Sequence, residues 1–219
     1  MLVPGAMSGG TIEWIEGAPE SGSEANNRVL PEPDDELPKE PPSDDDAALR
    51  PVEPPRTQAR LSMATRVGLI SDTHGLLRDE AAGFLRGCDL IVHAGDICDR
   101  AVLDALAAIA PTVAVRGNND RGAWAEALRE SELVEVGGIV LYAIHDIAAI
   151  DLDPQAAGVR VVVSGHSHKP GVEERGGVFF VNPGSAGPRR FTLPISIAEL
   201  VVDGGDVSVR FAQLADRRP

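Results

Sequence analysis

An apolar run leads into two metal-ligand residue types in the stretch Val67-Gly68-Leu69-Ile70-Ser71-Asp72-Thr73-His74. The first four residues have the composition of a buried strand, and carboxylates and imidazoles are common ligands of metal ions. The spacing of Asp72 and His74 predicts that both side chains point the same way from the end of an extended segment. This stretch therefore predicts a strand with a candidate site at its carboxyl end.

Four later apolar runs also end close to potential ligands. They are residues 90–92 before Gly95-Asp96, 113–115 before Gly117-Asn118-Asn119-Asp120, 139–144 before His145-Asp146, and 161–163 before Gly165-His166-Ser167-His168. Four of the chain's five histidines lie at the ends of the five runs. Because α/β sheets build sites at the carboxyl edge of their strands, we expect these side chains to meet in one site.

The pattern from residue 66 onward alternates between strands and helices. Residues 78–85 and 100–109 have helical spacing, which predicts parallel strands joined by right-handed crossovers. Beyond Glu132 the pattern changes to short strands. A hairpin is expected at 133–141, and further strands at 178–182, 195–202 and 207–212. We therefore expect an α/β fold in which two sheets pack as a sandwich with helices outside.

The first 64 residues have a different composition from residues 65–219, which we interpret as one domain. Ten of the 17 prolines lie at or before Pro55, acidic residues cluster there, and apolar periodicity is missing. These features predict a disordered, acidic, proline-rich tail. Trp14 and Ile15 fit either a short docking motif or a solvated tail. Met63, just before the domain, is a candidate translation start, which an intact mass of the native protein would test.

Charge and cysteine content exclude several classes of protein. A net charge of −14 argues against a partner with a nucleic-acid backbone, although bound metal ions could still attract a small phosphorylated substrate. Two cysteines are too few for a disulfide framework and fit a reducing compartment. We find neither an apolar stretch of about 18–20 residues, as a membrane span requires, nor the pattern of a leader peptide. We expect a cytoplasmic protein without membrane association. The sequence leaves open whether exposed strands pair to form a homo-oligomer.

The candidate ligands comprise two carboxylates, one amide and four imidazoles. They are Asp72, His74, Asp96, Asn118, His145, His166 and His168. This set is too large for one ion and suits two. Mixed nitrogen and oxygen ligation favours Mn, Fe, Zn, Co or Ni over Mg or Ca. Two such ions about 3.5–4 Å apart can bind the attacking and leaving oxygens of a phosphoryl transfer.

The ordered series D-x-H, G-D, G-N, a later His and G-H-x-H resembles the calcineurin-like metallophosphoesterase superfamily. The short chain and Asn182-Pro183-Gly184-Ser185 resemble its small, compact phosphodiesterase branch. The resemblance extends from about Arg66 to the C-terminus. It implies a four-layer α/β/β/α fold, two divalent ions with Mn favoured in assays, and hydrolysis of a small phosphoester, with phosphodiesters as the expected substrates.

The resemblance also implies roles for individual residues. One ion would be held by Asp72, His74 and His168, the other by Asn118, His145 and His166, and Asp96 would bridge both. A hydroxide between the ions would attack phosphorus in line. Arg100, directly after Asp99, resembles the D-R pair that some members use around the phosphate, so it could bind a phosphoryl oxygen.

Two positions depart from the family pattern. Asn119 stands where many phosphomonoesterases of the family have a histidine that protonates the leaving group, and an amide has no such proton near neutral pH. We therefore expect Asp120 or a metal-bound water to act as the acid, and diesters to be favoured; Asn119 could hydrogen-bond the substrate phosphate. Asp146 stands where glycine commonly follows the later histidine, so His145 is expected to hold its ion less well.

Alternative interpretations remain at this stage. The same fold serves as a protein-interaction scaffold in a retromer subunit with a degraded metal site, whereas all seven ligand positions are filled in this chain. A nucleotide phosphatase or pyrophosphatase is a second rival, which a substrate profile would distinguish. His93 is expected to be a hydrogen-bonded core histidine. Arg189-Arg190 fits either solvated charge or a contact to the substrate phosphate.

Overall fold

The computed structural model describes residues 12–16, 64–190 and 192–216. Its regular elements, in chain order, are β1 (Ile12–Glu16), β2 (Thr65–Ile70), α1 (Asp79–Leu85), β3 (Leu90–His93), α2 (Arg100–Ala107), β4 (Thr112–Ala114), α3 (Ala123–Glu126), β5 (Ser131–Val136), β6 (Ile139–Ile144), the 3₁₀ helix η2 (Ile147–Ala149), β7 (Val159–Val163), β8 (Gly171–Arg175), β9 (Val178–Asn182), β10 (Ser196–Asp203) and β11 (Asp206–Gln213). Within this part of the chain, no helix is long and apolar enough to cross a membrane.

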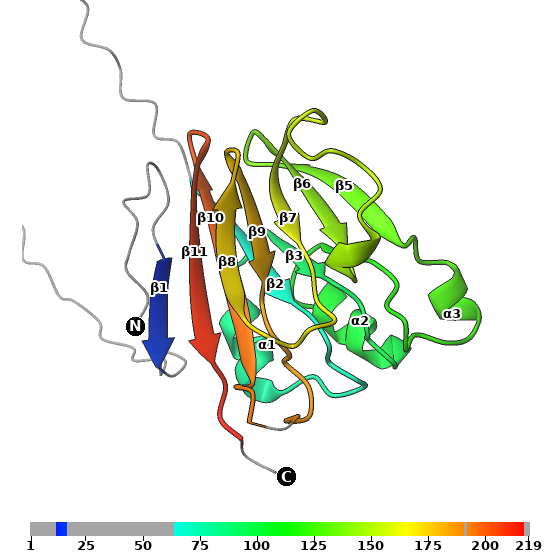
Figure 1. Ribbon diagram of the computed structural model, residues 1–219. Helices are drawn as coiled ribbons and strands as arrows, with labels where there is room; N and C mark the ends of the chain where they lie inside the picture. Colours follow the sequence, from blue (N-terminus) through cyan, green and yellow to red (C-terminus); the bar gives the residue numbers. More distant parts are fainter. Residues whose placement is uncertain (1–11, 17–63, 191, 217–219) are drawn as a thin grey trace, which may run out of the picture. The chain divides into compact units, whose positions relative to one another are not determined.

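The strands form two mixed sheets. One sheet has the order β1-β11-β10-β2-β3-β4, and the other has the order β5-β6-β7-β9-β8. Strands β2, β3 and β4 are parallel neighbours, as the strand–helix alternation predicted. Strands β5 and β6 form the expected antiparallel hairpin. The parallel pairing places the ends of β2, β3 and β4 at one edge of the first sheet, and the segments with the candidate ligands follow these ends in the sequence. Figure 1 shows β2 and β3 within this sheet.

Apolar side chains fill the space between the two sheets, which confirms the predicted sandwich. Val67 and Leu69 of β2 share this core with Leu141 of β6 and Val161 of β7. Because successive side chains of a strand point to opposite faces, Ile70 lies in a second core, together with buried residues of α1 and α2.

Helix α1 packs closely against β2 at Gly68. A Cβ atom at this position would lie 2.2 Å from Cδ2 of Leu85, so a larger residue would require this buried leucine to move. Helix α2 begins after Asp99, whose side chain accepts a hydrogen bond from the backbone N–H of Ala101 and so caps the helix. It buries Val102 and Leu106. These contacts cover one face of the first sheet with the two helices.

The outer face of the second sheet has a thinner cover. Tyr142, Val162 and neighbouring buried residues form a third apolar cluster, and Ile150 and Leu152 pack against it. These last two residues belong to the segment that follows η2, which spans only three residues. The fourth layer of the expected α/β/β/α arrangement is therefore a 3₁₀ helix with irregular chain in this protein.

Four elements were not anticipated from the sequence: the short 3₁₀ helix η2, helix α3 and the strands β8 and β1. Helix α3 has only four residues, and β8 alternates exposed and half-buried residues, so neither has a strong apolar pattern. Strand β1 lies inside the expected disordered tail and pairs in parallel with β11, from Ile12 opposite Val209 to Glu16 opposite Gln213. The disorder expected for residues 1–64 therefore does not hold for these five; apart from them and Ala64, the tail lies outside the described residues.

Candidate metal centre

The loop after β2 does not continue the strand, although the spacing of Asp72 and His74 suggested an extended segment. Both residues have positive φ angles, 54° and 46°. His166 and His168 behave in the same way, with φ of 64° and 56°. Each pair therefore converges because its backbone turns at both residues, and the expectation of an extended D-x-H or H-x-H segment was wrong.

Left-handed backbone is concentrated at the candidate ligands. In the described part of the chain, six non-glycine residues have positive φ: Asp72, His74, Asp96, Cys98, His166 and His168. Five of these six belong to the predicted ligand set. Asp and His tolerate this conformation better than most residues, yet each instance costs on the order of 1–3 kcal/mol and tends to mark a functional site. The fold thus keeps strained backbone at the positions where the sequence predicted metal ligands.

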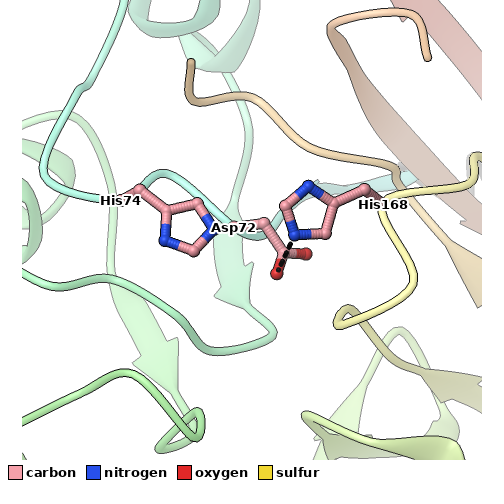
Figure 2. A group of neighbouring side chains, drawn as sticks. All are labelled: Asp72, His74 and His168. Carbon is pink, nitrogen blue, oxygen red and sulfur yellow. Dashed lines mark ion pairs between the residues drawn. The ribbon is translucent and has the colours of Figure 1, made fainter. Parts of the chain in front are cut away.

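Figure 2 shows the first group of candidate ligands, Asp72, His74 and His168. One potential ligand atom from each lies within 4.8 Å of the others. Nε2 of His168 is 3.3 Å from Oδ1 of Asp72. This carboxylate oxygen and Nε2 of His74 are buried, and neither has a hydrogen-bond partner among the described residues. Buried polar atoms without a partner are costly, and a cation at this point would satisfy both of them.

Asp72 is completely buried and nevertheless favours the charged form. Burial is the largest single effect and raises the pKa of this carboxyl, but the contacts with His168 and Ser71 and the charges of protonated His168 and His145 together outweigh it, so the net pKa lies below its ordinary value. An ionised carboxylate is the form that binds a metal ion.

A second group surrounds the side-chain oxygen of Asn118. Nε2 of His145 and Nδ1 of His166 each lie 3.0 Å from this oxygen. Nδ1 of His145 lies 2.7 Å from the carbonyl oxygen of Ala94, to which it can only donate. In the neutral ring, Nε2 of His145 then carries a lone pair, which faces the side-chain oxygen of Asn118, itself an acceptor. Lone pairs that face one another are the arrangement expected around a cation.

Asp96 lies between the two groups. Its Oδ2 is 3.9 Å from Nε2 of His74, and its Oδ1 is 3.4 Å from Nε2 of His145. Asn119 holds this carboxylate, because its backbone N–H donates to Oδ1 at 2.8 Å and its side-chain amide donates to Oδ2 at 2.5 Å. The structure thus brings all seven predicted ligands together, and Asp96 lies beside one histidine of each group.

Glycine at position 117 allows the loops of the centre to approach each other. A Cβ atom there would lie 2.1 Å from the backbone nitrogen of Asp96 and 2.3 Å from its Oδ1. Asp120 fastens the same loops. Its Oδ1 accepts from the N–H of Cys98 and its Oδ2 from the N–H of Gly117, each at 2.7 Å. Both oxygens of this buried carboxylate act as acceptors, which argues against the expected role of Asp120 as a proton donor.

Comparison with known proteins agrees with this geometry. The family model described as calcineurin-like phosphoesterase superfamily domain matches residues 65–205. The chain belongs to this superfamily. It is 34% identical over 152 residues to a probable metallophosphoesterase of Methanocaldococcus jannaschii, with 63% of this chain and 76% of that protein covered.

Solved structures of the same fold include proteins with different descriptions. One is described as a novel archaeal phosphodiesterase (TM-score 0.58, 22% identity, 68% of this chain and all of that chain covered). Another is Vps29 of Entamoeba histolytica in complex with Zn²⁺ (TM-score 0.57, 22% identity, 70% and 95% covered). At these identities the likeness shows the fold alone. Membership of the superfamily supports divalent metal binding and hydrolysis of phosphoesters.

The arginines near the phosphoesterase centre differ in their surroundings. Arg100 pairs with Asp104 one turn further along α2, where both side chains are exposed, so its contact with a phosphoryl oxygen stays a prediction. Arg189 pairs with Asp216 at 3.4 Å. By contrast, Arg190 lies close enough to His74 that its charge, together with the larger effect of burial, lowers the pKa of that imidazole. The sequence drew attention to Arg189-Arg190 but could not separate the two.

Asp146, the second departure from the family pattern, lies beside the candidate ligand His166. Its Oδ1 accepts from the N–H of Ala148 and caps η2, and its Oδ2 lies 3.9 Å from Nε2 of His166, which is too far for a direct hydrogen bond. The structure thus gives Asp146 a capping role and places its charge near His166, which the sequence did not predict.

Proposed function

We propose that this protein is a phosphodiesterase whose seven ligand residues hold two divalent ions. The observation that supports this best is the meeting of His145, Asn118 and His166: one ring nitrogen of each histidine lies 3.0 Å from the side-chain oxygen of Asn118, and the nitrogen of His145 faces this oxygen with its lone pair. Asp72, His74 and His168 would hold the first ion, these three residues the second, and Asp96 would contact both. The ligand chemistry is compatible with Mn, Fe, Zn, Co or Ni. Vps29, which has a similar fold, is described in complex with Zn²⁺.

The bound ions would supply positive charge against the phosphate and lower the pKa of a water molecule. The chain's own residues would position the reaction. Asn119 holds the Asp96 carboxylate through two hydrogen bonds, so the bridging ligand has one orientation. We propose that Arg190, close to His74, donates to a phosphoryl oxygen of the substrate.

Diesters are the proposed substrates because the described residues of the site offer no evident acid for a poor leaving group. Asn119 offers an amide, and Asp120 uses both oxygens to accept backbone hydrogen bonds. The description of a similar fold as an archaeal phosphodiesterase supports this choice. A cytoplasmic location, a small-molecule substrate and the absence of a nucleic-acid partner belong to the same proposal.

The test is hydrolysis of bis(4-nitrophenyl) phosphate beside 4-nitrophenyl phosphate, by the full chain with added Mn²⁺ and with a chelator as control. Metal-dependent turnover that favours the diester is expected. Turnover that favours the monoester would contradict the phosphodiesterase proposal and favour a nucleotide phosphatase instead. No turnover of either ester, with metal bound, would favour the scaffold role that the fold performs in other proteins.

A further inference from the structure

A pocket of about 590 Å³ opens beside the metal centre. Asn118, His145 and His166 form part of its wall, so a molecule in it would lie against the second group of ligands. The pocket continues past α3 to Tyr142 and Asp151. Its volume falls within the range of roughly 300–1,000 Å³ that is common for small-molecule sites and exceeds what a phosphate group needs.

We propose that this pocket binds one alcohol portion of the diester, and that this portion is an uncharged, hydroxyl-rich group such as a nucleoside or a sugar. The inference rests on the proposed phosphodiesterase function and specifies its substrate class. It follows from the position of the pocket against the centre and from the polar groups that line it.

Several charged groups of the lining already have partners within the protein. Arg116 pairs with Glu130, and Asp120 accepts two backbone hydrogen bonds. Arg121 remains: it donates to the backbone carbonyl of Asp120 at 3.0 Å and has no carboxylate partner among the described residues. A hydroxyl or carbonyl oxygen of a ligand could accept from this guanidinium.

The other charged side chains of the lining are carboxylates. Glu126 is exposed on α3, Asp146 caps η2, and Asp151 accepts from the hydroxyl of Tyr142 at 3.2 Å. Ionised carboxylates only accept hydrogen bonds, so they suit the hydroxyl groups of a ribose or a sugar. A second anionic group on the substrate, placed in the part of the pocket away from the two ions, would face these carboxylates rather than the positive charge of the ions. A long hydrocarbon chain would remove water from these charges without replacing its hydrogen bonds.

Two neighbouring alanines give a matched test. Ala149 lines the pocket and is exposed, so Ala149→Trp fills the pocket without changing the core. Ala148 is also exposed but is not part of the lining, so Ala148→Trp is the control. The substrates are thymidine 5′-(4-nitrophenyl) phosphate and methyl 4-nitrophenyl phosphate, which share one leaving group and differ in the other alcohol. Thermal unfolding would check that both variants remain folded.

We expect the unmodified protein to hydrolyse the nucleoside diester with a kcat/KM about tenfold or more above that of the methyl diester. Ala149→Trp should lower kcat/KM for the nucleoside diester by about tenfold and leave the methyl diester within about twofold, whereas Ala148→Trp should change neither. A thymidine diester with an additional 3′-phosphate should react more slowly than thymidine 5′-(4-nitrophenyl) phosphate, and Glu126→Gln should reduce that difference.

Equal kcat/KM for the two diesters, or equal effects of the two tryptophans, would overturn the assignment of the pocket while leaving the phosphodiesterase proposal intact. Faster hydrolysis of the 3′-phosphorylated diester would overturn the choice of an uncharged alcohol. Absence of turnover with both diesters, with metal bound, would instead contradict the proposed function and the pocket assignment with it.

Discussion

Nε2 of the buried residue His93 lies 3.0 Å from Oγ1 of Thr73, and this contact joins two loops of the metal centre. The N–H of Gly95 donates to Nδ1 of the same ring at 3.2 Å, so the ring proton of neutral His93 lies on Nε2 and is donated to Thr73. The hydroxyl of Thr73 in turn donates to the carbonyl oxygen of Ile97. The loop with Asp72 and His74 is thereby fixed to the loop with Asp96, and the prediction of a hydrogen-bonded core histidine is confirmed.

Stability should depend on pH through His93. Burial lowers the pKa of this imidazole from 6.5 to about 3 in the folded protein. Between these two values the unfolded chain binds more protons than the folded protein, so the free energy of unfolding rises with pH across this window and is unaffected by His93 above it. We expect His93→Gln to lose part of this dependence. Urea unfolding of the unmodified protein and of His93→Gln, with chelator at about pH 5 and about pH 8, measures this dependence. If the free energy of unfolding changed equally with pH in both proteins, the low pKa assigned to His93 would be contradicted.

Gly117 and Gly83 should respond oppositely to alanine. A Cβ at position 117 would lie 2.1 Å from the backbone nitrogen of Asp96, so Gly117→Ala must displace a loop of the centre, and we expect loss of stability and of metal affinity. Gly83 lies within α1 and has nothing within 4 Å of its added Cβ, so Gly83→Ala should stabilise the protein by about 0.5–1 kcal/mol. Thermal unfolding and metal titration would reveal both effects. Equal behaviour of the two variants would show that the close contact at position 117 is not limiting.

The sheets and the two longer helices could be predicted because their sequences carry strong signals. Strand β7 consists largely of valine, and α2 has a regular apolar spacing with a capping aspartate. Strand β8, with the sequence Gly-Val-Glu-Glu-Arg, lies at the edge of its sheet and buries little, so its pattern is weak. The pairing of β1 with β11 is a long-range contact that local composition cannot predict.

The residues that form the candidate metal centre could be predicted from the sequence, but their geometry could not. Strand ends identified Asp72, Asp96 and His145 because parallel topology brings such ends together. The left-handed backbone at Asp72 and His74 follows from loop contacts, such as the N–H of His74 donating to the carbonyl of Asp96. Tertiary contacts also give Asp120 its role, since its carboxylate accepts from the N–H groups of Cys98 and Gly117 and so joins two loops. The place of Asp120 in the sequence, directly after Asn119, did not indicate this.

Asp96→Asn should remove metal and activity together. The carboxylate lies near Nε2 of both His74 and His145, so one substitution weakens the ligation of both ions. We expect turnover of the diester to fall by at least about a hundredfold and metal content to fall with it. Asp104→Asn, at an exposed position paired only with Arg100, is the control for loss of one carboxylate. Full activity of Asp96→Asn would disprove the bridging role.

Asn119→His should change the balance between monoester and diester hydrolysis. A histidine at this position can supply the proton that an amide lacks, so the ratio of monoesterase to diesterase activity should rise. The result is the ratio of kcat/KM for an alkyl phosphate monoester, whose leaving alkoxide needs a proton, to kcat/KM for bis(4-nitrophenyl) phosphate, whose leaving group does not. An unchanged ratio would mean that the leaving-group proton comes from elsewhere. The substitution keeps the backbone hydrogen bond to Oδ1 of Asp96 but removes the side-chain hydrogen bond to Oδ2, and thermal unfolding would account for that loss.

Substitution of two adjacent arginines, Arg189 and Arg190, would distinguish a contact to the substrate phosphate from a general effect of surface charge. Arg190→Ala should lower kcat/KM for the diester by about tenfold or more, because it removes a cation close to His74. Arg189→Ala removes the same charge from the chain but breaks only a surface pair with Asp216, and we expect less than about a twofold change. Steady-state kinetics at one ionic strength compares them. Similar losses in both variants would assign the effect to overall charge.

The most direct test of the account is the number of Mn²⁺ ions bound per chain, measured by titration of the metal-free full-length protein while diester turnover is followed in the same samples. The account predicts two equivalents per chain, with turnover absent in chelator and restored as the second equivalent binds. Binding of one equivalent or none, or turnover that persists in chelator, would contradict the two-ion centre built from Asp72, Asp96, His145 and their neighbours.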